Sequence, residues 1–161
     1  MTERVIETVP DEFESLPEGF CFTDLLQPLY RKVDGEGISF GIVVQDHHSN
    51  TMGFCHGGVL MTLADIAAAS GVNLARGKRS GSPTINLAVD FIATAKMGEW
   101  IEATAEQVSV KRRFGFSSGA IHNSRGIVAR FNGTFYLPDH PGLRQNGEVA
   151  SGILQDLSDE P

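Results

Sequence analysis

Residues 53–72 read Gly-Phe-Cys-His-Gly-Gly-Val-Leu-Met-Thr-Leu-Ala-Asp-Ile-Ala-Ala-Ala-Ser-Gly-Val, a glycine-rich entry followed by a long apolar run. As a helix from about residue 57 to residue 76, this run is apolar on nearly every side. We expect such a helix to be buried, because it has no polar face to turn to water. A single carboxylate, Asp65, lies in its middle. A buried charge is costly unless it is paired, neutralised or used, so Asp65 is either a functional residue or a structural partner of a buried hydroxyl or amide.

The flanking segments predict one antiparallel sheet. A strand is expected before the helix at residues 38–44, and four more after it at 84–91, 100–110, 114–122 and 127–136. Strict alternation places Ile85, Leu87, Val89 and Phe91 on one face of the strand 84–91. In the strand 100–110 the alternation is interrupted near Gln107, as it would be at a β-bulge. A sheet that buries one very apolar helix must curl around it, which predicts an α+β architecture.

The ends of the chain differ from its middle in composition. Residues 1–19 are acidic and contain two prolines, which predicts a flexible arm, and residues 139–161 predict a disordered tail. Residues 20–138 form one expected domain, opening with a short surface helix at 22–32 that Thr23 would cap.

Global composition excludes several classes of function. A net charge of -7 argues against nucleic-acid or anionic-membrane binding. The chain shows no signal-peptide pattern and no apolar run near the ~20 residues of a membrane span, so a cytoplasmic protein is expected. Two cysteines give no disulfide framework, and the histidines and cysteines match no zinc-ligand spacing, so no metal is expected.

The start of the helix predicts a site for a developing negative charge. A helix N-terminus presents unpaired N–H groups and a partial positive charge, and Gly57 and Gly58 leave that end bare. Such donors can stabilise an oxyanion. The alternative is that the two glycines only permit a tight turn into the helix.

Spacing along the helix predicts a site shared by two copies. Asp65 follows Gly57 by eight residues, or ~12 Å along the axis, too far for both to act on one carbonyl within one chain. We therefore expect the tip of one helix to face Asp65 of a second chain across a two-fold axis. A stripe of small or polar residues would face that partner: Gly58, Thr62, Asp65 and Ala69.

Further polar residues are candidates for substrate contacts. Asn50 could orient a carbonyl or a water, and His56 could bond nearby backbone. Basic residues in this acidic chain are candidates for a nucleotide phosphate, although each could equally be a solvated side chain: Arg76, Lys78, Arg79, Lys111, Arg112 and Arg113.

Taken together, the motifs resemble the hotdog-fold thioesterases of the phenylacetate-degradation (PaaI) type. The resemblance rests on His56-Gly57-Gly58 followed by Asp65, on Asn50 upstream, and on residues 84–91 leading to Lys96-Met97-Gly98-Glu99. It covers residues 20–137. Thr94 departs from the pattern, because the family often has a proline in this loop.

The resemblance implies hydrolysis of acyl-CoA thioesters at a dimer interface, commonly within a homotetramer, with coenzyme A as part of the substrate and no separate cofactor. It implies that the Gly57 N–H binds the thioester oxygen and that Asp65 of the facing chain acts as base or nucleophile. Asn50 and His56 would orient the thioester, and the Thr84 hydroxyl would help to position water. The alternatives are a non-catalytic acyl-CoA sensor, a hydratase or dehydratase of the same fold, and an interaction protein in which Asp65 is structural.

Overall fold

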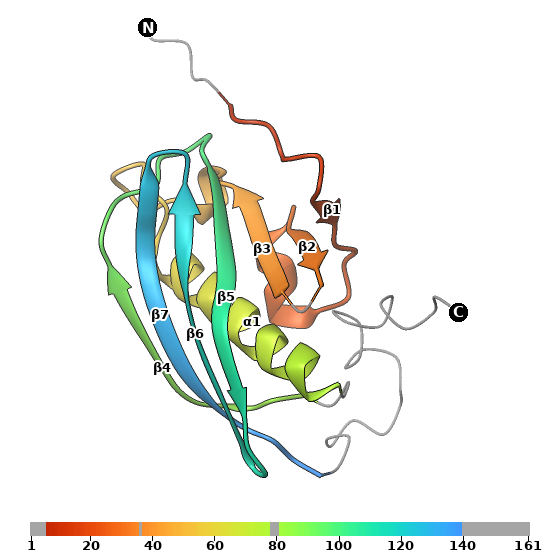
Figure 1. Cartoon of the computed structure of the whole chain (residues 1–161). Helices are drawn as coiled ribbons and strands as arrows, with labels where there is room; N and C mark the ends of the chain where they lie inside the picture. The colour runs from red at the N-terminus through yellow and green to blue at the C-terminus, as the bar shows by residue number, and fades with distance from the viewer. Residues whose placement is uncertain (1–5, 36, 78–80, 140–161) are drawn as a thin grey trace, which may run out of the picture.

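The described residues fold as a curled sheet wrapped around one long α-helix (Figure 1). The computed structural model describes residues 6–35, 37–77 and 81–139. All neighbouring strands pair antiparallel, in the order β1-β2-β3-β5-β6-β7-β4, which confirms the predicted α+β architecture. The elements are β1 (Glu14–Ser15), the 3-10 helix η1 (Cys21–Leu26), β2 (Tyr30–Asp34), β3 (Gly37–Val43), the 3-10 helix η2 (Asp46–His48), α1 (Gly57–Arg76), β4 (Thr84–Phe91), β5 (Trp100–Val110), β6 (Phe114–Asn123) and β7 (Gly126–Tyr136).

Helix α1 begins and ends where local signals predict. His56 is its N-cap, and the His56 side chain accepts a hydrogen bond from the Gly58 N–H. Gly77 ends the helix in the left-handed conformation at φ 65°, and its N–H donates to the Leu74 carbonyl. Glycine adopts this conformation at little cost, which is why it commonly follows the last helical residue.

One side of α1 packs on the sheet, and the described residues leave the other side open. Leu63, Ala64 and Ala67 are fully buried, whereas Met61 is 41% exposed. The expectation of a helix buried on every side is therefore wrong for a single chain, because the sheet covers only one side. By length and composition α1 could also cross a membrane, contrary to the sequence reading. Half of its most apolar window is buried inside the domain, which is typical of a core helix.

The C-terminal half of α1 lies close to the sheet because glycines stand at the contact on both sides. A Cβ on Gly71 would lie 2.7 Å from the Cβ of Ala105 on β5. A Cβ on Gly115 of β6 would lie 2.3 Å from a methyl group of Val72. Real Cβ atoms do not pack at these distances, so the two glycines set the separation between helix and sheet.

Strand β5 contains a bulge, and strand β4 is an edge strand. The predicted bulge in β5 is present between Ala105 and Gln107. Strand β4 lies at the free edge of the sheet and pairs only with β7 among the described strands (Figure 1). Leu87 and Val89 of β4 pack against the core, but Phe91 is 54% exposed, because none of the described residues covers the end of this edge strand.

Residues 22–32 differ from the predicted surface helix. The chain forms the short 3-10 helix η1 and then enters β2, which pairs with β3. Pro28 cannot continue a helix, because its ring clashes with the preceding turn and it lacks an N–H donor. The predicted Thr23 cap is absent as well, since the N-cap of η1 is Phe20 and makes no side-chain cap bond.

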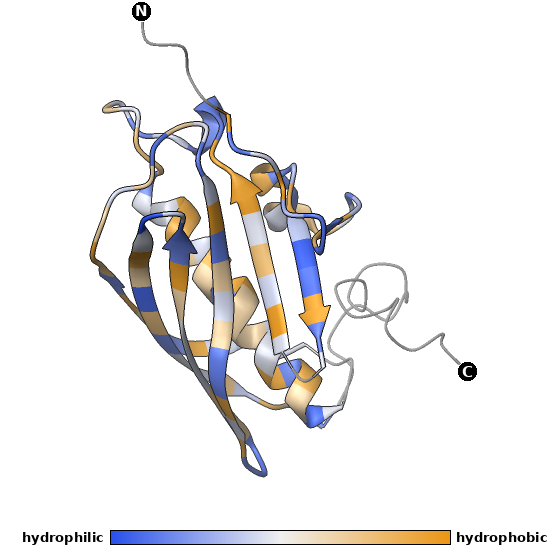
Figure 2. Cartoon of the chain, turned by 45° about the horizontal axis from the view of Figure 1, so that its top comes forward, coloured by the Kyte–Doolittle hydropathy of each residue, from blue (hydrophilic) through white to orange (hydrophobic). Residues whose placement is uncertain are grey.

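Residues 6–19 are docked on the sheet, although their acidic composition predicts a flexible arm. Phe13 and Leu16 are buried, and the Phe13 ring packs edge-on against Trp100 with centroids 4.9 Å apart. Glu14 pairs with the buried Arg31 of β2. These contacts, together with hydrogen bonds from Glu7, hold the segment on the sheet. The tail beyond Asp139 and residues 1–5 lie outside the described part of the chain. Figure 2 shows that hydrophobic and hydrophilic residues alternate along the strands.

We expect Gly71→Ala to lower the free energy of unfolding by about 1–2 kcal/mol, because the overpacking against Ala105 outweighs the gain in helix propensity. The measurement is urea unfolding followed by circular dichroism. Gly81→Ala is the matched control, since a Cβ there meets nothing within 4 Å. Equal stabilities of the two variants would contradict this account of the helix–sheet contact.

Candidate active site at the N-terminus of α1

The loop before α1 is closed by Asn50. Its side-chain Oδ1 accepts hydrogen bonds from the N–H groups of Met52 at 2.9 Å and Phe54 at 3.2 Å, and its own N–H donates to the Phe54 carbonyl at 2.8 Å. The Asn50 oxygen is thus occupied by the loop itself. Its Nδ2 group, which has no hydrogen-bond partner within the described residues, is the part that could contact a substrate.

His48 anchors this loop from inside the protein. It is 1% exposed, and its Nε2 bonds the Leu26 carbonyl while its Nδ1 accepts from the Gln45 N–H, both at 3.0 Å. The His48 carbonyl in turn accepts the N–H of His56 at 2.8 Å. Burial, with the neighbouring His47 as a second cause, lowers the pKa of His48 to about 4, so the ring is neutral near pH 7. Sequence reasoning did not single out His48, because its role depends on contacts with η1.

One backbone donor at the helix tip remains open. The Gly58 N–H donates to His56 Nδ1 at 2.9 Å, and the N–H groups of Val59 and Leu60 donate to the His56 carbonyl. The Gly57 N–H has no acceptor among the described residues. Because His56 Nδ1 accepts a bond, a neutral His56 carries its proton on Nε2, which makes it a second donor at the tip.

Phe91 lies against this donor and was missed as a site residue. Its ring carbons come within 3.4–4.0 Å of the position a Cβ would take on Gly57. The ring thus lies beside Gly57 at the start of α1. The alternation in β4 placed Phe91 on one face with Leu87 and Val89, but only the fold shows that the end of β4 meets the start of α1.

Asp65 and Thr84 come together although they are 19 residues apart. The Thr84 hydroxyl donates to Asp65 Oδ1 at 2.7 Å, and Asp65 is half-buried rather than fully buried. Its Oδ2 has no hydrogen-bond partner in the described part of the chain. This carboxylate is therefore oriented by one hydroxyl and keeps one oxygen available.

A single chain does not bring Asp65 to Gly57. Both residues lie in the same unbroken helix α1, so the separation of ~12 Å along its axis is fixed. Thr62 lies between them and donates its hydroxyl to the Gly58 carbonyl at 2.8 Å, inside the helix. The open side of α1 therefore carries two separate groups, a donor at its tip and a carboxylate two turns further on.

The predicted basic residues lie at the other end of α1. Arg76 is in its last turn and donates to the Pro138 carbonyl at 2.7 Å. Lys111, Arg112 and Arg113 are exposed in the turn between β5 and β6, and the Arg113 carbonyl accepts from the Leu137 N–H. Arg76 and this turn thus meet the same segment after β7, whereas Lys78 and Arg79 lie outside the described residues.

The buried thiol of Cys55, next to His56, is unsuited to act as a nucleophile. Burial raises the pKa of the Cys55 thiol to about 12, so it is not a thiolate near neutral pH. No group of three His, Cys, Asp or Glu residues within the described ranges is arranged to hold a metal ion.

One long helix embraced by a curled antiparallel sheet defines the hotdog fold, and comparisons with known proteins agree. The family model described as Thioesterase superfamily matches residues 52–129. A Pseudomonas aeruginosa protein named "Putative esterase" is 30% identical over 131 residues, which are 81% of this chain and 98% of that protein. The chain belongs to the thioesterase superfamily.

Solved structures share this fold. A mutant of phenylacetic acid degradation protein PaaI from Thermus thermophilus is 25% identical with a TM-score of 0.62, over 73% of this chain and 99% of that one. A hypothetical thioesterase from Streptococcus pneumoniae, solved with coenzyme A, has a TM-score of 0.62 at 17% identity, over 81% of this chain and 98% of that one. The PaaI-type resemblance noted in the sequence is thereby confirmed.

We expect the free energy of unfolding to fall as the pH drops from 6.5 towards 4, by up to ~3 kcal/mol from His48 alone. Below pH 6.5 the histidine binds a proton in the unfolded state but stays neutral in the folded state, because its folded-state pKa is lowered to about 4. Proton binding therefore stabilises the unfolded state. Urea unfolding at several pH values measures this slope. His48→Gln cannot titrate there and should show a flatter slope between pH 6.5 and 5; an unchanged slope would remove His48 as the cause.

Proposed function

We propose that this protein is an acyl-CoA thioesterase whose site is shared by two chains. The observation that carries the proposal is the pair of open groups on one side of α1. The Gly57 N–H is a donor without an acceptor in the described structure, and the Asp65 carboxylate is held by Thr84 with one oxygen free. Membership of the thioesterase superfamily supports the reaction type.

The two groups have complementary roles in thioester hydrolysis. Asp65 takes a proton from a water molecule, whose oxygen then bonds to the thioester carbonyl carbon. The Gly57 N–H stabilises the oxyanion that forms, and His56 and Asn50 donate from either side of it. When the C–S bond breaks, the coenzyme A thiolate leaves and is protonated. In an alternative route, Asp65 attacks the carbonyl carbon itself and water hydrolyses the resulting anhydride.

The proposal requires a second copy, because α1 is rigid and keeps its two groups ~12 Å apart. The side of α1 that bears them is open and partly apolar, with Met61 41% exposed. Strand β4 beside it is a free edge, and exposed edges and apolar faces of this kind are commonly covered by another chain. A two-fold axis at this face would bring Gly57 of one copy towards Asp65 of the other. Two such dimers would form the homotetramer that the family commonly shows.

The coenzyme A part of the substrate would extend towards the basic end of α1. Arg76 follows Asp65 by eleven residues, ~16 Å along the helix, and the exposed 111–113 turn meets the same segment. Lys78 and Arg79 continue this basic run in the sequence. The Streptococcus pneumoniae neighbour, whose structure contains coenzyme A, supports a ligand of this class.

A non-catalytic acyl-CoA sensor of the same fold is the second candidate, and a hotdog hydratase or dehydratase is a third. The experiment that separates them is a panel of aryl, short-chain and long-chain acyl-CoA thioesters with a thiol-detecting assay. Turnover of any member supports the thioesterase. Binding by calorimetry without thiol release would favour the sensor, and addition of water to an enoyl-CoA would favour the hydratase.

We expect Asp65→Ala to abolish hydrolysis, with kcat lower by a factor of about a thousand or more, while assembly and Tm stay nearly intact. Thr84→Val should lower kcat by roughly tenfold, because Asp65 loses the hydroxyl that orients it, and Thr84→Ser should restore it. Asp90→Asn is the matched control, since this exposed carboxylate lies on the same strand. Full activity of the Asp65→Ala variant would contradict a catalytic role and would indicate that Asp65 is structural.

We expect Gly57→Pro to remove the proposed oxyanion donor without unfolding the protein. Proline is tolerated at the first helical position, and His56 at ψ 138° already has the extended conformation that a following proline requires. The loss in kcat should be about a hundredfold.

Mixing the strongly impaired Gly57→Pro chain with the Asp65→Ala chain then tests the shared site. Random pairing gives mixed dimers with one intact and one doubly defective site, so about a quarter of wild-type activity should return. Unmixed samples are the control. No recovery, despite subunit exchange verified by native mass spectrometry, would contradict a site built from two chains.

A further inference from the structure

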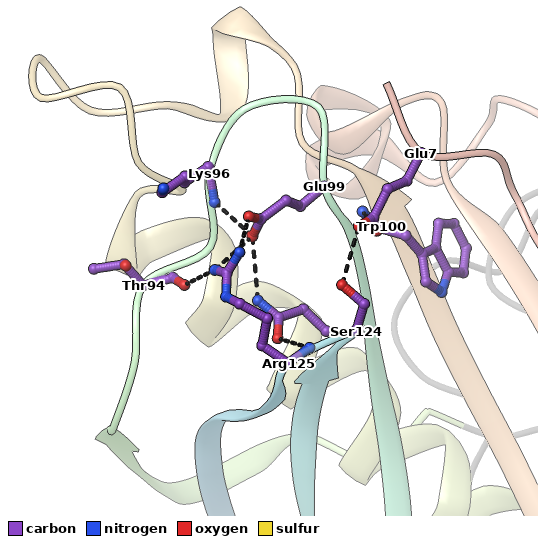
Figure 3. Close-up of polar contacts among 8 residues, drawn as sticks. Glu7, Thr94, Lys96, Glu99, Trp100, Ser124 and Arg125 are labelled. Carbon is purple, nitrogen blue, oxygen red and sulfur yellow. Dashed lines mark hydrogen bonds and ion pairs between the residues drawn. The ribbon is translucent and has the colours of Figure 1, made fainter. Parts of the chain in front are cut away.

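A buried carboxylate and an arginine join two loops close to the candidate site (Figure 3). Glu99 lies at the end of the loop between β4 and β5 and is 9% exposed. The Arg125 guanidinium, from the turn between β6 and β7, bonds both Glu99 oxygens, with Nη2 3.0 Å from Oε2. The same Nη2 donates to the Thr94 carbonyl at 3.1 Å, so Arg125 bonds both ends of the loop 94–99.

Two more donors complete the environment of Glu99. The Lys96 N–H donates to Oε2 at 2.9 Å and the Asn123 side-chain amide donates to it at 3.2 Å. Burial alone would raise the pKa of Glu99, but the bonds from Arg125, Lys96 and Asn123, together with the Arg125 charge, outweigh it and lower the pKa. Glu99 is therefore a charged, fully engaged carboxylate near neutral pH.

The loop that Arg125 and Glu99 clamp lies directly behind the entry to α1. The Cys55 N–H donates to the Ala95 carbonyl at 2.8 Å, the Met97 N–H donates to the Gly53 carbonyl at 3.4 Å, and Phe54 forms a bridge with Lys96. Residues 53–55 are thus one short strand-like segment held by residues 95–97. This segment leads into His56 and the Gly57 N–H, and it also closes the Asn50 loop.

The N-terminal segment reinforces the same place from outside. The Glu7 carboxylate accepts from the Trp100 N–H at 2.9 Å and from the Ser124 hydroxyl at 3.0 Å, beside Glu99 and Arg125 in the chain (Figure 3). The Glu7 N–H donates to the Gly98 carbonyl at 2.8 Å. Three segments far apart in sequence therefore converge on the loop that supports the helix entry.

We propose that the Glu99–Arg125 ion pair is a latch that positions the Asn50, His56 and Gly57 groups for thioester hydrolysis, acting through residues 94–97 and 53–55. This inference rests on the proposed function. Arg125 is 52% exposed in its side chain, and exposed ion pairs contribute little to global stability. Its bonds to both ends of one loop restrict that loop, and small displacements of catalytic donors have large effects on rate.

The test compares latch variants with a matched pair elsewhere. Arg125→Gln and Glu99→Gln should each lower kcat by about tenfold or more, with KM within about twofold of wild type. Arg125→Lys should be intermediate, because a lysine can hold the charge but not the bidentate bond. Lys32→Gln is the control: it breaks the Lys32–Glu102 pair at 3.4 Å, between β2 and β5, and should leave kcat unchanged. Latch variants with wild-type kcat would overturn the proposal.

A second measurement does not depend on activity. Hydrogen exchange of the amides of residues 53–58 should be faster in Arg125→Gln than in wild type by about tenfold, and unchanged in Lys32→Gln. Asn123→Ala removes one bond to Glu99 and the side-chain acceptor of the Arg125 N–H, so it should also speed exchange, and it covers the case in which Glu99→Gln fails to fold. Unchanged exchange would overturn the latch, whereas a wild-type protein that hydrolyses no thioester but shows the exchange difference would overturn only the proposed function.

Discussion

The close contact between α1 and the sheet is the constraint on which the rest of this structure depends. Gly71 and Gly115 allow the helix to lie against β5 and β6 at a separation that a methyl group at either position would prevent. The helix is thereby held along one direction, with its capped start beside the end of β4. The helix itself sets the distance between the donor at its tip and the carboxylate of Asp65, and the contact with the sheet fixes where both groups lie.

The tip of α1 is organised so that nearly all of its donors are already used. His56 takes up the Gly58 N–H with its side chain and the next two N–H groups with its carbonyl, which leaves Gly57 alone without an acceptor among the described residues. An unpaired donor at the positive end of a helix attracts negative charge. Asp65, oriented by Thr84, lies on the same open side but out of reach. A single chain therefore holds two halves of a reaction centre that do not face each other.

Support for this tip comes from two directions. On the inner side, the neutral ring of His48 ties the loop before α1 to η1. On the outer side, the loop 94–99 pairs with residues 53–55 and is itself clamped by Glu99 and Arg125. The neutral His48 and the charged Glu99–Arg125 pair thus support the loop before α1 from different sides. This arrangement explains why polar residues collect around a helix entry whose own sequence is mostly glycine and apolar residues.

The sequence by itself determined the features that depend on neighbours in the chain. The period of apolar residues located α1 and the four strands after it, the glycine-rich entry marked the start of α1, and helix geometry set the gap between Gly57 and Asp65. Local pattern misread residues 6–19 and 22–32, since Phe13, Leu16 and Arg31 acquire their roles only by packing against distant strands. Tertiary structure alone decided that Thr84 meets Asp65, that Phe91 lies over Gly57, and that Glu99 and Arg125 lie behind the helix tip. These contacts join residues brought together by strand order, and strand order depends on the packing of the whole sheet around α1 rather than on any one segment.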